Sequence, residues 1–344
     1  MHYRMEWRSF ALTLLLNFSL AACGSDENTP TDQGISGPPG TGGNNTAGNA
    51  GNNNSSLGGS NAQGGETSAG QGGTSAGQGG TSAGQGGTGP MSCEPGRHLG
   101  DQSDDEEGFY QIKVNYVLPS DGIDEELDLN GKIEDSVKAW SQWFVAQTGG
   151  IAFRLDTCDG NLDIRFVRLS RTEAELKAKG VFIRDAIEEE MGQMGLLSST
   201  KLESVYYGGD AAETCGSAAW PPALIGRVGA VYLKGTFSNP SIPPCASNPL
   251  GNVEQPTYFD FSMLHEIVHL LGFAPSCAPH HVLSGHVSDS PNDLMYAGSL
   301  PWNPTTLDVG NDDYFGANIP GCPDLSTSVF LSPLPANAQL PPGW

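Results

Sequence analysis

Residues 261–273 read Phe-Ser-Met-Leu-His-Glu-Ile-Val-His-Leu-Leu-Gly-Phe, an apolar stretch with two histidines four positions apart. On a helix, side chains at positions i and i+4 lie on the same face, so His265 and His269 can bind one zinc ion together. Glu266 lies beside them, where it can take a proton from water activated by that ion. Burying two neutral histidines and a carboxylate without a partner would be costly, and zinc is the simplest partner. The pattern therefore predicts a helix that carries a hydrolytic zinc site.

A hydrolytic zinc site has three protein ligands and an open fourth position, so one ligand must come from another segment. Five of the chain's seven histidines lie between positions 265 and 286, which is more than one zinc ion requires. The residues alone therefore leave three candidates for the third ligand, which are His280, His281 and His286.

The motif resembles that of the metzincin family of zinc peptidases. Residues 265–272 match the first eight positions of the pattern His-Glu-x-x-His-x-x-Gly-x-x-His, in which the glycine turns the chain toward the third ligand. The final histidine of the pattern falls on Pro275, so this chain departs from the family at that position. The resemblance implies a zincin-like fold and a zinc-dependent endopeptidase, with Glu266 as the general base.

Residues 285–296 resemble the remainder of the metzincin signature. In that family a turn containing methionine follows the third histidine and lies beneath the metal, and Leu294-Met295-Tyr296 is similar to that turn. The resemblance implies that His286 is the third ligand after an inserted segment, with His280 as the alternative, and that Met295 forms an apolar floor without binding the metal. Metzincins also pair an extended peptide with a strand at the cleft, and residues 228–233 are expected to form that strand.

The sequence leaves two other classes of function open. A non-catalytic, surface-anchored binding module could hold zinc as a structural ion, although such a site would not require Glu266. Glycoside hydrolysis needs a pair of carboxylates, which Asp312 and Asp313 could supply, but adjacent acidic residues are more often solvated turn residues.

Hydrophobic periodicity predicts the α/β class, with one mixed twisted sheet, two long helices, the zinc helix and a loop-rich C-terminal subdomain after residue 273. Alternating or continuous apolar runs predict strands. Apolar residues at helical spacing predict the helices. The expected strands are 111–118, 151–155, 162–169, 204–207 and 228–233, and the expected long helices are 130–147 and 182–197.

The N-terminus is typical of an export signal. Arg4 and Arg8 precede an apolar stretch that ends in Leu20-Ala21-Ala22-Cys23, and this order of charged, apolar and small residues describes a cleaved signal peptide. Leu-Ala-Ala-Cys resembles the lipobox of bacterial lipoproteins, which implies that Cys23 is acylated and inserts in a lipid bilayer. An ordinary secretory signal is the alternative. We expect an exported lipoprotein at the outer membrane or cell surface of a bacterium.

We expect three regions along the chain, namely a signal peptide at 1–22, a tether at 23–90 and a catalytic domain at 91–344. Residues 24–90 lack aromatic and basic residues and repeat Thr-Ser-Ala-Gly-Gln-Gly-Gly three times, so they cannot bury enough apolar surface to fold. Six cysteines remain after Cys23, an even number that predicts disulfides in an exported chain. Cys93 has a second possible role, because a thiolate could cap the zinc ion.

Composition excludes several partners. The net charge of −23 disfavours a polyanion, so we expect no nucleic-acid partner. No apolar run reaches the roughly 18 to 20 residues that a membrane-spanning helix requires. The expected partners are a peptide or protein substrate and the bilayer, and the expected state is a monomer.

Overall fold

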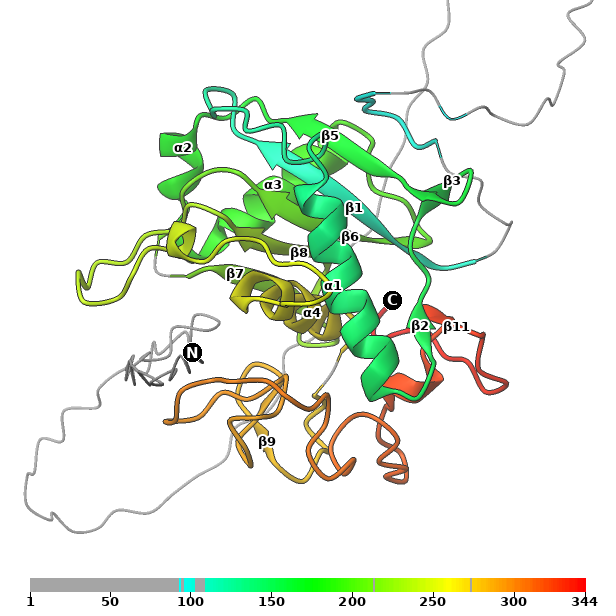
Figure 1. The fold of residues 1–344 in the computed structure, drawn as a ribbon. Coiled ribbons are helices and arrows are strands. Elements are labelled where there is room, and N and C mark those ends of the chain that lie inside the picture. The colour runs from blue at the N-terminus through cyan, green and yellow to red at the C-terminus, as the bar shows by residue number, and fades with distance from the viewer. Residues whose placement is uncertain (1–92, 94–95, 103–108, 213, 273) are drawn as a thin grey trace, which may run out of the picture. The chain divides into compact units, whose positions relative to one another are not determined.

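The computed structural model describes residues 93, 96–102, 109–212, 214–272 and 274–344 (Figure 1). The predicted signal peptide at 1–22, the predicted tether at 23–90 and the predicted acylation site at Cys23 lie outside the described residues. Among the helices of the described part, none has the length and apolar character needed to cross a membrane.

A five-stranded mixed sheet forms the centre of the described fold (Figure 1). Its four neighbouring strands β5, β1, β6 and β8 run parallel, and β7 pairs antiparallel with β8 at one edge. In sheet order the strands are β5 (Ile164–Arg168), β1 (Gln111–Leu118), β6 (Lys201–Tyr207), β8 (Leu224–Tyr232) and β7 (Gly216–Trp220).

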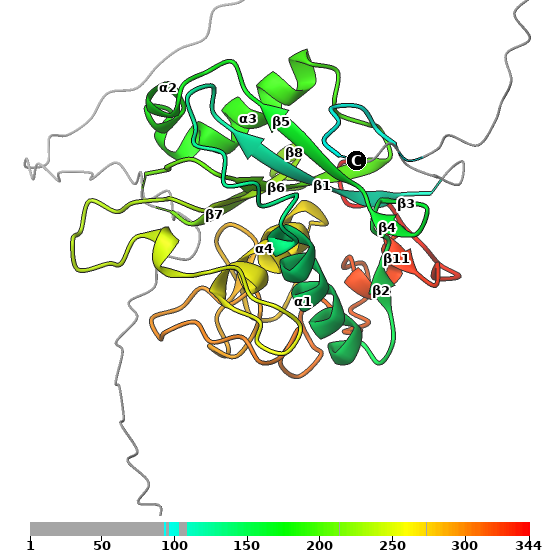
Figure 2. The ribbon, with the colours of Figure 1, turned by 45° about the horizontal axis from the view of Figure 1, so that its top comes forward.

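Helices cover both faces of this sheet (Figures 1 and 2). Helices α1 (Lys132–Gln147) and α4 (Tyr258–Leu270) pack on one face, where their apolar side chains meet one side of β1 and β6. Helices α2 (Glu173–Lys177) and α3 (Ile183–Gln193) cover the other face. The predicted α/β class with a mixed sheet is therefore confirmed.

Strand β1 has the predicted bounds but not the predicted exposure. Its alternating polar residues indicate a half-buried strand, yet all eight of its residues are buried, because Lys113 and Asn115 pair with buried acidic groups of neighbouring segments. The buried charge is balanced where Lys113 Nζ lies 2.9 Å from Asp156 and also pairs with Asp163. Polar alternation in this strand reflects buried ion pairs rather than contact with water.

The segment after α4 is rich in loops, as predicted. Its ordered elements are short and pair locally or with distant residues. They are the hairpin β9 (His281–Val282) with β10 (His286–Val287), β11 (Leu331–Ser332) paired with β2 (Ala152–Phe153), and the 3-10 turn Leu325–Thr327. The other short elements are the hairpin β3 (Thr157–Cys158) with β4 (Asn161–Leu162), and the 3-10 turns Gly180–Phe182 and Cys245–Ser247.

The six cysteines of the described part form three disulfides, which confirms the prediction of disulfide bonds. One of them, Cys277–Cys322, closes the loop-rich C-terminal segment, and the others are Cys93–Cys158 and Cys215–Cys245. Cys93 is therefore paired and does not offer a thiolate to a metal ion.

Candidate metal centre

Helix α4 carries both histidines of the motif inside the core. Most of its residues are buried, which is typical of a helix that is apolar on nearly every side. Its N-terminus is stabilised where the Thr257 amide donates to the Asp260 carboxylate at 2.6 Å, a contact found in capping boxes. Asp260 also accepts a hydrogen bond from Ser136 of α1 at 2.5 Å. These contacts anchor α4 against α1 two turns before the motif.

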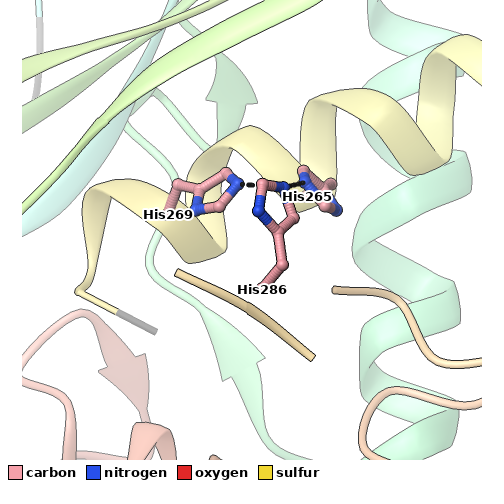
Figure 3. A group of neighbouring side chains, drawn as sticks. All are labelled: His265, His269 and His286. Atoms are coloured by element: carbon pink, nitrogen blue, oxygen red, sulfur yellow. Dashed lines mark hydrogen bonds between the residues drawn. The ribbon is translucent and has the colours of Figure 1, made fainter. Parts of the chain in front are cut away.

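Three imidazoles converge beside α4 (Figure 3). His265 Nε2 lies 3.3 Å from His286 Nε2, and His269 Nε2 lies 3.2 Å from the same atom. His286 comes from β10, in the loop-rich segment, and all three side chains are buried. The structure thus brings His286 to the motif histidines across the inserted segment.

The hydrogen bonds on the far side of two rings fix their tautomers. His265 Nδ1 donates to the Leu294 carbonyl at 2.7 Å, and His286 Nδ1 donates to the Leu283 carbonyl at 3.1 Å. Because a carbonyl oxygen only accepts, each Nδ1 carries the proton and each neutral ring has its lone pair on Nε2. Two lone pairs then face each other at 3.3 Å, an arrangement that is repulsive unless a cation lies between them.

Burial keeps these rings neutral. It lowers the pKa of His265 to about 3, and the neighbouring His286 adds to this effect. Burial also lowers the pKa of His269 well below 6.5 and lowers the pKa of His286. At neutral pH the three side chains are therefore ready to donate lone pairs to a metal ion.

The spacing fits a zinc ion. Zinc–nitrogen bonds of about 2.0 to 2.1 Å at tetrahedral angles place neighbouring ligand nitrogens about 3.3 Å apart. The two Nε2 separations of 3.2 and 3.3 Å match this value. Two of the three rings also donate from Nδ1 to a backbone carbonyl, which is typical of histidines that bind zinc.

Glu266 lies between the metal-facing side of α4 and the edge strand β7. A methyl group added at Gly216 of β7 would lie 2.5 Å from Glu266 Oε1, so this glycine leaves space for the carboxylate. Glu266 is buried, and it stands on α4 three residues before His269. Its carboxylate lies against β7, and its main chain directly follows that of His265.

The edge strand of the sheet next to α4 differs from the predicted one. Residues 228–233 were expected to offer a free edge, but β8 pairs with β6 on one side and with β7 on the other. The edge strand is β7, which sequence patterns missed because its Gly-Ser-Ala-Ala-Trp sequence lacks β-branched residues. A short segment of small residues forms this edge because the packing of α4 requires small side chains there.

The turn that resembles a Met-turn is buried next to the third histidine. Met295 is fully buried, and its carbonyl accepts a hydrogen bond from the Val287 amide at 3.0 Å. Its neighbour Leu294 supplies the carbonyl that binds His265 Nδ1. The turn thus contacts the segments of two of the three histidines.

His280 lies in a different group. Its Nδ1 is 3.0 Å from Asp313 Oδ2, and this bond raises the pKa of His280. Asp313 is fully buried by this pairing, and Asp312 is exposed beside it. His280 and the two carboxylates therefore form an ion-pair group apart from the three imidazoles. A carboxylate paired in this way is poorly suited to act as a glycosidase nucleophile.

Comparisons with known proteins give a distant structural likeness. No family model matches the chain, and neither does any curated protein. The fold is similar to the crystal structure of archaemetzincin from Methanopyrus kandleri, at 14% sequence identity and a TM-score of 0.30, over 55% of this chain and 83% of that chain. A likeness this distant assigns no activity, so the chemistry of the site rests on its own geometry.

Proposed function

We propose that this chain is a zinc-dependent endopeptidase, with His265, His269 and His286 as the metal ligands and Glu266 as the general base. The observation that carries the proposal is the pair of facing lone pairs on His265 and His286 Nε2, 3.3 Å apart, beside a buried carboxylate. A structural zinc site needs no such carboxylate, whereas a hydrolytic site does.

Each group of the proposed site has its own role in peptide hydrolysis. Bound zinc would polarise the scissile carbonyl and lower the pKa of a water molecule. Glu266 accepts the proton of the attacking water and delivers it to the leaving amine. Gly216 keeps the space that the Glu266 carboxylate occupies.

The substrate is proposed to be a peptide that pairs with β7. This strand is bonded to β8 on one side, and among the described strands none pairs with its other side. Main-chain pairing gives affinity with little dependence on side chains, so we expect a broad preference among extended peptides. The Glu266 carboxylate next to Gly216 supports this choice of strand.

Glu266→Ala tests the proposal in the full chain. We expect the variant to keep one zinc ion per chain and to lose casein hydrolysis by at least about 100-fold, because only the proton transfer is removed. Glu254→Ala, at an exposed position, is the matched control and should behave as the wild type. Full activity in zinc-loaded Glu266→Ala would refute the role of this carboxylate, and zinc without hydrolysis in the wild type would favour a binding module.

We also propose that the protein works as an exported lipoprotein monomer at the outer membrane or cell surface, held in the bilayer through acylated Cys23. The order of residues before Cys23 supports this location. Cells that produce Cys23→Ser should release the protein in soluble form, and a variant that stays in the membrane fraction would exclude acylation as the anchor.

A further inference from the structure

The Leu294 carbonyl is a shared acceptor next to the metal ligands. It accepts hydrogen bonds from His265 Nδ1 at 2.7 Å and from Trp302 Nε1 at 3.1 Å. The position of this one oxygen therefore sets the direction in which His265 Nε2 points. Whatever holds Leu294 in place also orients the first histidine of the site.

One buried carboxylate holds the turn that contains Leu294. Asp293 Oδ1 accepts hydrogen bonds from the Met295 amide at 2.7 Å and from the Tyr314 hydroxyl at 2.8 Å. Its Oδ2 accepts a hydrogen bond from the Val309 amide at 2.8 Å. Asp293 thus joins the turn to two later segments of the chain.

The Asp293 carboxylate is buried without a charged partner among the described residues. Asp293 is fully buried, and among the ion pairs of the described residues it takes part in none. Its hydrogen-bond partners are uncharged amides and a hydroxyl. Burying a carboxylate without a cation costs free energy, and the three hydrogen bonds that Asp293 accepts offset part of this cost.

We propose that Asp293 is a positioning residue for the metal site, which acts by fixing the Leu294 carbonyl and through it the tautomer and direction of His265. The inference rests on the proposed function, since it assumes that His265 binds zinc. Partners of this outer kind change metal affinity by about 10- to 100-fold in zinc proteins. Asp293 itself touches neither the metal-facing nitrogens nor the substrate strand.

The matched control is Asp308, a second buried carboxylate in the same loop-rich segment. It accepts hydrogen bonds from the amides of Asp313, Tyr314 and Phe315, and none of its bonds reaches the turn at 293–296. Asp293→Asn and Asp308→Asn therefore make the same substitution at two buried carboxyl groups. Only the first change removes a hydrogen bond to the turn itself, whereas Asp308 reaches Asp293 only through Tyr314.

The experiment measures zinc affinity by competition with a chelator in the full chain. We expect Asp293→Asn to weaken zinc binding by about tenfold or more, and Asp308→Asn to leave it within about twofold of the wild type. Saturating zinc should restore the kcat of Asp293→Asn with an unchanged KM, since Glu266 and β7 remain intact. Zinc should not rescue Glu266→Ala, which distinguishes positioning from catalysis.

A second variant covers the case in which Asp293→Asn does not fold. Tyr314→Phe removes one donor to Asp293 and should weaken zinc binding in the same direction. Wild-type affinity in both variants, or equal losses in Asp293→Asn and Asp308→Asn, would overturn the inference. A wild-type chain that binds no zinc would overturn the inference and the proposed function together. Zinc binding without hydrolysis would refute only the function.

Discussion

The imidazoles of His265, His269 and His286 are neutral because they are buried, and this sets how the site responds to pH. Burial lowers all three pKa values below the ordinary 6.5, to about 3 for His265. In the folded chain, protons compete with a metal ion only below these lowered values. The folded rings therefore stay uncharged to a lower pH than the same side chains in an unfolded chain.

This leads to a prediction about zinc affinity between pH 7.5 and 5.5. Three histidines with ordinary pKa values would lose about a thousandfold in affinity over this interval, because each must release a proton at the lower pH. We expect a loss of less than about tenfold here. Calorimetric titration with zinc at both pH values measures the affinity, and a loss near a thousandfold would mean that the folded histidines titrate normally.

At the scale of elements, the contact between α4 and the edge of the sheet positions Glu266, the proposed general base. Gly216 of β7 faces the end of the Glu266 side chain, whereas Gly229 of β8 faces its Cβ and main-chain oxygen, each 3.3 Å from an added methyl group. Both glycines lie in extended backbone outside the left-handed region. Their role is therefore close approach between helix and sheet, which any larger side chain would prevent.

Gly216→Ala should separate catalysis from metal binding. The added methyl group would lie 2.5 Å from Glu266 Oε1, and the end of a side chain can move aside more readily than the main chain. We expect kcat to fall about tenfold or more, by loss of alignment of the base, with zinc affinity and the thermal unfolding midpoint little changed.

Gly229→Ala is the comparison for this prediction. Its methyl group would meet Leu270 at 3.0 Å and the rigid part of Glu266, so we expect a lower unfolding midpoint as well as lower activity. Full activity in Gly216→Ala would show that the carboxylate does not work from its present position.

The sequence patterns predicted some helices and strands and missed others, and each outcome has a physical reason. Strand β1 and helix α1 were predicted with bounds that agree within two residues, because their hydrophobic periodicity is local and continuous. Strand β7 was missed because a strand of Gly, Ser and Ala has no periodic signal of its own. Its conformation comes from pairing with β8 and from the helix packed on it.

At the scale of the whole molecule, the three imidazoles join the core helix to the loop-rich C-terminal segment. His265 and His269 belong to α4, and His286 belongs to the β9–β10 hairpin. A metal ion held by all three would cross-link these parts, as the Cys277–Cys322 disulfide does at another point of the segment.

Removal of the metal should therefore loosen one part of the fold and leave the other intact. With a chelator, we expect faster hydrogen exchange at the amides of Val287 and Ser288, next to His286, and unchanged exchange in β1 and β6, whose hydrogen bonds lie within the sheet. His286→Ala should show the same pattern without chelator and should lose zinc, whereas His280→Ala should retain both zinc and protection. Equal effects of the two substitutions would shift the ligand assignment toward His280.

The amino-acid sequence by itself determined the α/β class, the presence of disulfides and a helix that carries His265, Glu266 and His269. These features depend on composition or on residues within a few positions of one another. They can therefore be predicted without knowledge of the fold. The tertiary structure decided that His286 and not His280 meets the motif, that β7 is the edge strand, which cysteines pair, and that Asp293 holds the turn behind His265. Each of these depends on contacts between distant segments, which the order of strands and the packing of α4 bring together.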